Sequence, residues 1–137
     1  MKTIFAIAVM AMSAAGLLQM SFVQQSNTSK RESPLACDRL ALTAEQRRRH
    51  FDELGPTLRS LKTGFRDLPD GFEFQFPSDM KTYQLLAEWV AGERVCCPFF
   101  DIELRSDREG GPVWLRLTGR EGVKQFMAVE GASWLKP

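Results

Sequence analysis

Hydrophobic residues recur at helical spacing in the segment that follows residue 43. Thr43 and Gln46 form a capping-box pattern, so a helix is predicted to begin directly after Thr43. Gly55-Pro56 is predicted to kink or break this helix midway, because proline lacks the backbone donor that a helix needs. The apolar positions that predict one buried helix face are Phe51, Leu54, Leu58 and Leu61.

Alternation of apolar and polar residues predicts a β-hairpin over residues 64–77. A turn over residues 68–71 joins its two strands. There Pro69 presets the φ angle, and Gly71 is expected to adopt the left-handed conformation. Every second position of the second strand is a phenylalanine, at Phe72, Phe74 and Phe76.

The second half of the chain repeats this order of helix and hairpin. A helix is predicted to begin at a cap formed by Ser78 or Asp79 and to end before Pro98, because a residue preceding proline avoids the helical region. Alternation over residues 100–105 and 113–118 predicts two further strands. The buried stripe of the helix is expected at Met80, Tyr83, Leu86, Ala87 and Val90.

A last helix is predicted to follow a capping box at Thr118 and Glu121 and to end at Gly131. Its inward residues are expected to be Val123, Phe126 and Met127. The resulting order is α-β-β-α-β-β-α. We therefore predict an α+β fold, in which two hairpins form a four-stranded antiparallel sheet and the helices pack on one face.

The first 33 residues have a different composition from this domain. Residues 1–23 are apolar and carry one charge, at Lys2, which predicts an export signal cut before Gly16 or an uncleaved membrane anchor. Residues 24–33 form a polar linker, and residues 34–137 form a single domain of about 100 residues. The expected location is the periplasm, either free or anchored to the membrane by the N-terminal segment.

Overall charge excludes one class of partner. Lys and Arg number 18 and Asp and Glu number 17 among 137 residues, so the formal charge of +1 argues against nucleic-acid binding. The run of residues 47–49, all arginine, is interpreted as a solvated helix face, with anion binding as the alternative. Trp114 occupies the polar side of its strand, where it is expected to be an exposed contact or to pack under the linker.

Candidate chemistry concentrates where the second helix ends. Cys96 and Cys97 are adjacent there, and Cys37 is the only other cysteine. Thiolates select soft ions, and three thiols suit Hg(II), As(III) or Cu(I), whereas two sulfurs are an incomplete zinc set. Glu93 projects over the same helical face as the pair and is expected to be an oxygen ligand or a proton acceptor. His50 is a candidate fourth ligand.

Three other interpretations of the cysteines stay open. A disulfide between neighbours is strained, so Cys37 bonded to Cys96 or Cys97 is easier to build and leaves one thiol over. Nucleophilic catalysis is disfavoured, because a helix C-terminus opposes a thiolate. Inert burial of both neighbours is disfavoured, because successive side chains point in different directions.

Three segments together resemble a known group of proteins. They are Leu35-Ala-Cys-Asp38, then Glu93-Arg-Val-Cys-Cys-Pro-Phe-Phe100, then Gly111-Pro-Val-Trp-Leu-Arg-Leu-Thr-Gly119 with Glu121-Gly-Val-Lys124. The chain resembles small uncharacterised bacterial proteins with a Cys-Cys-Pro-Phe motif over residues 34–129. This resemblance implies that Cys37, Cys96 and Cys97 belong to one pattern. It favours a single three-thiol site.

A second resemblance is to organomercurial lyases, which cleave a carbon–mercury bond with cysteines and an acidic residue. It implies that Cys37 and one of Cys96 and Cys97 correspond to those cysteines, and that Asp101 corresponds to the acidic residue that transfers the proton.

The leading hypothesis is an exported, non-enzymatic domain that binds a soft metal or metalloid ion, such as Hg, Cu, As or Zn. Cys37, Cys96 and Cys97 would be the ligands, with Glu93 as an auxiliary ligand. The expected partner is the metal ion or a small thiol-reactive ligand. A membrane contact is expected only through an uncleaved N-terminal segment. The alternatives are a thiol-redox or thiol-dependent enzyme, and a structural or interaction domain with inert cysteines.

Overall fold

A computed structural model of the protein describes residues 32–137. The predicted leader (1–23) and nearly all of the predicted linker (24–33) lie outside the described residues. Within residues 32–137, no helix is both long enough and apolar enough to cross a bilayer.

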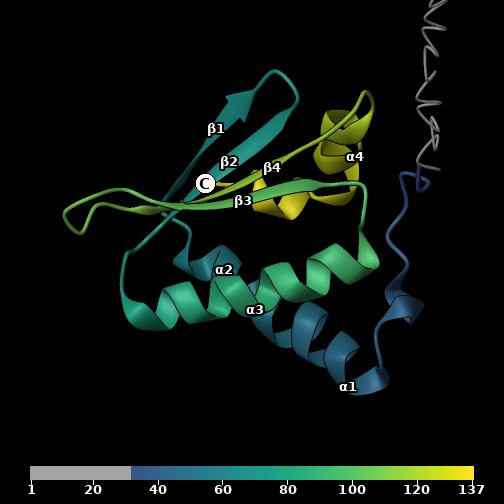
Figure 1. The fold of residues 1–137 in the computed structure, drawn as a ribbon, viewed down its shortest axis with the longest axis horizontal. Helices are drawn as coiled ribbons and strands as arrows, with labels where there is room; N and C mark the ends of the chain where they lie inside the picture. The colour runs from purple at the N-terminus through teal and green to yellow at the C-terminus, as the bar shows by residue number, and fades with distance from the viewer. Residues whose placement is uncertain (1–31) are drawn as a thin grey trace, which may run out of the picture. The chain divides into compact units, whose positions relative to one another are not determined.

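Helices and strands follow one another in the predicted order (Figure 1). The helical segments are η1 (Arg39–Ala41), α1 (Ala44–Arg47), η2 (Arg48–Leu54), α2 (Gly55–Leu61), α3 (Met80–Cys96), α4 (Val123–Glu130) and η3 (Ala132–Trp134). The strands are β1 (Gly64–Leu68), β2 (Gly71–Phe76), β3 (Asp101–Ser106) and β4 (Val113–Thr118). The predicted α+β class is confirmed.

The four strands form one antiparallel sheet in the order β1-β2-β4-β3. Each predicted hairpin is formed, and β2 and β4 join the two hairpins at the centre. Phe74 of β2 stands opposite Leu115 of β4, which stands opposite Leu104 of β3. This register places the apolar residues of the strands on one face.

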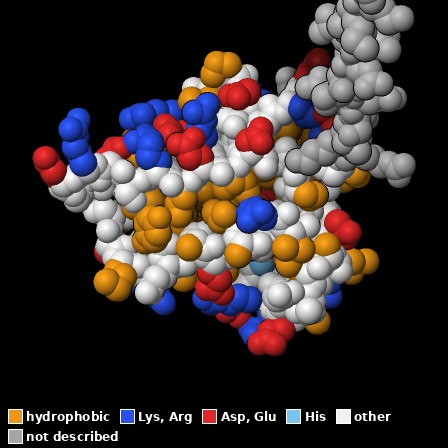
Figure 2. All heavy atoms as spheres, viewed as in Figure 1, with side chains coloured by type: hydrophobic (Ala, Val, Ile, Leu, Met, Phe, Trp, Pro, Cys, Tyr) orange, Lys and Arg blue, Asp and Glu red, His pale blue; other side chains and the backbone are white. Residues whose placement is uncertain are grey.

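The helices cover that apolar face. Figure 1 shows α1, α2 and α3 on one side of the sheet, and Val123 and Met127 of α4 belong to the same buried cluster. Figure 2 shows hydrophobic side chains gathered between sheet and helices, with charged side chains above and below them. The strand residues that contribute buried side chains to this core are Phe72, Phe74, Phe76, Val113, Leu115 and Leu117.

The first helix is capped as predicted but is not broken. Thr43 accepts from the N–H of Gln46 at 3.2 Å, and the Gln46 side chain accepts from the N–H of Thr43 at 2.9 Å. Before Pro56 the helix widens into the π-helical segment η2, where the N–H of Gly55 bonds to the carbonyl of His50, five residues back. The predicted break is therefore wrong. A wider turn accommodates the proline, and π-helical turns often occur at functional sites.

The predicted inward stripe of α3 is wrong at three positions. Asp79 caps the helix by accepting from the N–H of Thr82, but Met80, Tyr83 and Ala87 are exposed. Apolar residues alone do not define the inward face, because it also contains polar ones. Its buried residues are Thr82, Leu85, Leu86, Trp89, Glu93 and Cys96.

Two glycines have roles different from those predicted. Gly71 has no positive φ angle. A Cβ atom there would lie 2.0 Å from the carbonyl oxygen of Leu117, so the close approach of β4 requires glycine. The expected capping box of α4 is also absent: Gly122 is the N-cap, with a φ of 93°, and no side chain caps the helix.

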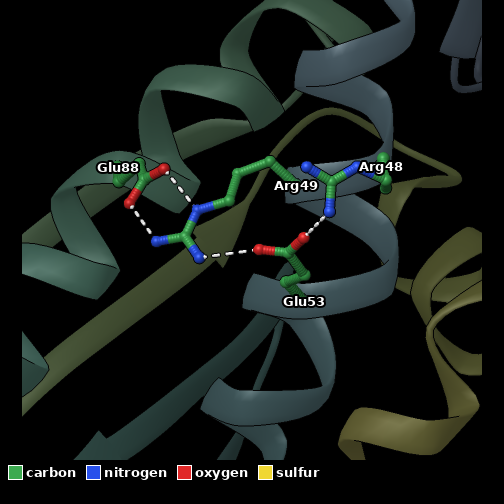
Figure 3. A network of polar contacts seen from close by, with 4 residues as sticks. All are labelled: Arg48, Arg49, Glu53 and Glu88. Carbon is green, nitrogen blue, oxygen red and sulfur yellow. Dashed lines mark hydrogen bonds and ion pairs between the residues drawn. The ribbon is translucent and has the colours of Figure 1, made fainter.

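The arginine run forms ion pairs rather than a free basic face. Arg49 donates from Nε and Nη2 to both carboxylate oxygens of Glu88 at 2.8 Å, and from Nη1 to Glu53 at 3.0 Å (Figure 3). Arg48 also pairs with Glu53, and Arg47 donates to backbone carbonyls. The hydrogen bond from Arg49 lowers the pKa of Glu88. This network joins η2 to α3.

Trp114 is buried on the outer face of the sheet, and is not an exposed contact. Its indole N–H donates to Asp107 at 2.9 Å, and this hydrogen bond lowers the pKa of Asp107. The guanidinium carbon of Arg66 lies 3.8 Å from the centre of the Trp114 ring, so an arginine from β1 covers it.

Candidate functional site

A disulfide bond joins Cys37 to Cys97, across 60 residues of sequence. Beside it, the N–H of Asp38 donates to the carbonyl of Cys96 at 2.7 Å. These two links hold the segment before η1 against the C-terminal end of α3. The pairing is one of the two that the sequence left open, and Cys96 is the remaining free thiol.

Both neighbouring cysteines are buried. Cys96 is 0% exposed and Cys97 is 1% exposed, so the sequence argument against burial of both neighbours is wrong. Cys96 is the last residue of α3, whereas Cys97 has left the helix, with a φ of −127° and a ψ of 65°. This change of backbone conformation is what lets two successive side chains enter the interior. Their sulfur atoms lie 3.7 Å apart.

The free thiol of Cys96 lies beside a buried histidine and a buried glutamate. Its Sγ is 3.9 Å from Nε2 of His50 and 3.8 Å from Oε2 of Glu93. Nε2 of His50 lies 2.9 Å from Oε2 of Glu93, close enough for the ring N–H to donate to the carboxylate. His50 and Glu93 are 3% and 7% exposed. Helical spacing explains part of the arrangement, because Glu93 is three residues before Cys96 on α3.

Aromatic rings fix the imidazole of His50. Trp89 stacks on it, with ring centres 5.4 Å apart, and Phe51 meets it edge-on at 4.7 Å. Its second nitrogen, Nδ1, is buried and has no hydrogen-bond partner among residues 32–137. A Cβ atom on Gly92 would lie 2.5 Å from Nδ1, so glycine at that position makes room for the ring.

Two overlapping sets of metal-ligating atoms result. In each set, the ligand atoms of three residues lie within 4.8 Å of one another. One set is Cys37, Glu93 and Cys97; the other is His50, Glu93 and Cys96. Glu93 belongs to both, and it lies at the centre of a mixed sulfur, nitrogen and oxygen environment. Such donors suit soft or borderline ions.

Burial raises the pKa of the Cys96 thiol to about 12, and the nearby carboxylate of Glu93 adds to the shift. The thiol is therefore protonated at neutral pH, so Cys96 is a weak nucleophile in this form. A metal ion bound at the same place would reverse this preference, because a coordinating thiol loses its proton.

The raised pKa predicts a loss of stability in alkali. An unfolded chain releases the Cys96 proton near the ordinary pKa of 9.0, whereas the folded chain retains it until about 12. Stability from this group is complete below pH 9 and falls as the pH rises. Between pH 8 and pH 10 the expected loss is about 1 kcal/mol. Urea titrations at both pH values should show that the Cys96→Ser variant loses less stability than the native chain. An equal loss of stability in the two proteins would contradict a pKa raised by burial of Cys96. Mass spectrometry should verify the Cys37–Cys97 pairing at both pH values.

All four predicted ligands meet at this one place. Cys37, Glu93, Cys96 and Cys97 contribute to the two sets, and His50 joins them from η2. Sequence reasoning missed the contact between His50 and Glu93, which are 43 residues apart. The only signal was that His50 is the single histidine of the chain. Asp101, which the second resemblance implied as an acid, is exposed at the start of β3 and belongs to neither set.

Comparison of the chain with protein-family models, with curated proteins and with solved structures finds no match. The resemblances drawn from sequence motifs therefore stay predictions.

Proposed function

We propose that this protein binds one soft metal or metalloid ion when its cysteines are reduced. Cys96, Cys97 and Cys37 would supply thiolates, and Glu93 and His50 would complete or support the ligand set. The observation that carries the proposal is the convergence of all three cysteine sulfurs around one buried carboxylate–imidazole pair.

Charge and burial support this assignment. Two or three thiolates in a buried site would repel one another and lose hydration, unless a cation balances their charge. A soft cation does this, and thiolate ligands favour Cu(I), Hg(II) and Zn(II) over hard ions. The paired His50 adds a nitrogen donor at 3.9 Å from Cys96. The donor chemistry therefore fits a soft ion better than magnesium or calcium, which prefer oxygen ligands.

The oxidised chain, in which the disulfide is formed, is unable to bind an ion through three thiolates. While Cys37 and Cys97 are bonded, neither sulfur is a thiolate, and only His50, Glu93 and Cys96 remain as donors. We therefore expect weak binding by the oxidised chain and tight binding by the reduced chain.

The test is native mass spectrometry of the full chain after complete reduction by a phosphine. Cu(I), Hg(II), Zn(II) and As(III) are added separately, and free thiols are counted beforehand. The expected result is one ion per chain, with thiol protons displaced. A fully reduced, folded chain that takes up none of these ions would overturn the proposal.

Matched variants identify the ligands. Cys97→Ser is expected to lower the affinity for the bound ion by about 100-fold or more, because it removes a ligand rather than a supporting contact. Glu88→Gln serves as the control, since Glu88 is on the same helix but pairs with Arg49 away from the cluster. Circular dichroism verifies that both variants fold.

We also propose that the protein works outside the cytosol, as an exported or membrane-anchored periplasmic domain. The apolar N-terminal segment supports this, and so does the disulfide, because disulfides form in oxidising compartments; metal binding there would require prior reduction of the bond.

A second candidate function is thiol-disulfide exchange. The observation that favours it is the free thiol of Cys96, 3.7 Å from the disulfide sulfur of Cys97. The raised pKa of Cys96 argues against it as the attacking group. A reduced chain that binds none of the ions would make this the better hypothesis.

A further inference from the structure

A cavity of about 180 Å³ lies beside the cysteine cluster, between α2, α3, α4 and η3. We call it the aromatic cavity, because five rings line it: Phe51, Trp89, Phe100, Phe126 and Trp134. An apolar cavity of about 150 Å³ accepts benzene. The volume therefore suits a ligand whose body is about the size of one aromatic ring.

The aromatic cavity also reaches the disulfide. Cys37 lines it together with His50 and Glu93, whereas Cys96 and Cys97 do not. Cys37 is also half-buried, while the other two cysteines are almost completely buried. A molecule inside the cavity consequently meets the disulfide from the side of Cys37.

Polar groups complete the lining. Arg59, Glu130 and Ser133 contribute to it, and the guanidinium carbon of Arg59 lies 5.7 Å from the centre of the Trp134 ring. With one guanidinium, Arg59, against the carboxylates of Glu93 and Glu130, the lining has no excess of positive charge to attract a multiply anionic ligand. An apolar body with a small reactive group therefore fits better than a multiply charged ligand.

We propose that the aromatic cavity admits a small organic thiol, which attacks Sγ of Cys37 and opens the disulfide. This inference rests on the proposed function, because it is the step that frees the thiols for metal binding. It goes further by naming the chemical class of the reductant and the sulfur that it attacks.

The reaction consumes two thiols. The first, as its thiolate, bonds to Sγ of Cys37; the bond to Cys97 breaks, and the electron pair stays on Sγ of Cys97. The Cys96 thiol lies 3.7 Å from that sulfur and is placed to donate a hydrogen bond to it. A second thiolate attacks the sulfur of the first thiol in the mixed disulfide and releases Cys37. Each reductant thiol gives up one proton and each cysteine gains one, so the products are two cysteine thiols and one organic disulfide.

The experiment measures the reduction rate of the oxidised full chain by two thiols, benzyl mercaptan and glutathione. Each rate is divided by the concentration of that thiol's thiolate form. It is then divided by the rate at which the same thiol reduces the disulfide of an unstructured peptide. We expect benzyl mercaptan to be at least about tenfold faster than glutathione on this scale. Peptide mapping of quenched samples should locate the benzyl adduct on Cys37. Equal normalised rates, or an adduct on Cys97, would overturn the proposal.

A blocking variant tests the route of entry. Ser133→Trp places a large ring at an exposed lining residue, and is expected to slow benzyl mercaptan by about tenfold. Ser106→Trp, at the exposed end of β3, is the matched control and should leave the rate unchanged. Equal rates in the two variants would contradict entry through the cavity. Reduction by a phosphine does not use the thiol step. Metal binding by the phosphine-reduced chain therefore tests the proposed function on its own, whether or not the thiol step occurs.

Discussion

Reduction of the Cys37–Cys97 disulfide is expected to lower the free energy of unfolding by about 4 kcal/mol. The bond closes a loop of 60 residues in sequence separation, and a cross-link over a loop of this length strongly restricts the unfolded chain. Such a loss is a large fraction of the 5–15 kcal/mol that is typical of a small domain. The metal-free reduced protein should therefore be marginally stable.

Urea unfolding with and without a phosphine reductant measures this loss. The double variant Cys37→Ala with Cys97→Ala is the control, because the reductant has no disulfide to act on and should leave its stability unchanged. A loss below about 1 kcal/mol in the native chain would contradict the expected contribution of the cross-link. Adding the bound ion to the reduced chain should restore stability, since a ligand that binds only the folded state stabilises it.

Replacing Glu93 by alanine is expected to cost about 3–5 kcal/mol. The carboxylate is 7% exposed and accepts from the ring N–H of His50, which is itself buried. Its removal leaves Nε2 of His50 with only the weak contact to the Cys96 thiol at 3.9 Å, and Nδ1 has no partner among the described residues. Removing one member of a buried charged or hydrogen-bonded pair is among the most destabilising of single substitutions.

Two further variants separate this effect from simple truncation. Glu93→Gln keeps an acceptor oxygen near His50 and should cost much less than Glu93→Ala. Glu88→Ala removes an exposed partner of Arg49 from the same helix and should cost about 1 kcal/mol or less. If Glu93→Ala and Glu88→Ala were equally mild in chemical denaturation, the His50–Glu93 contact would have no special importance for stability.

The sequence predicted the sheet better than the helices. Strand alternation identified both hairpins, because Phe72, Phe74 and Phe76 mark one face without ambiguity. Apolar spacing predicts the wrong inward face for α3, because Thr82 and Glu93 are buried polar residues, satisfied by Asp79 and His50. Hydrophobic periodicity contains no information about such pairs. The turn at Gly71 was misassigned for a related reason, since its constraint comes from β4, far along the chain.

The cysteine cluster was partly predictable. Adjacency of Cys96 and Cys97, with Glu93 one helical turn earlier, indicated a site on local spacing alone. The selection of Cys97 over Cys96 as the partner of Cys37 depends on where α3 ends, because only Cys97 has left the helix. The inclusion of His50 depends on how η2 packs against α3. Neither feature is encoded in a spacing of residues.

The position of the disulfide also determines how the domain would respond to mechanical load. A pulling force applied at the two ends of the chain passes directly from Cys37 to Cys97, so residues 38–96 are shielded from tension. Of the chain from Cys37 onward, only the 40 residues after Cys97, which include β3, β4 and α4, extend under load, to about 140 Å. Reduction would release a further 60 residues, about 210 Å. The same bond that controls the thiols therefore acts as a mechanical bypass for the first half of the fold.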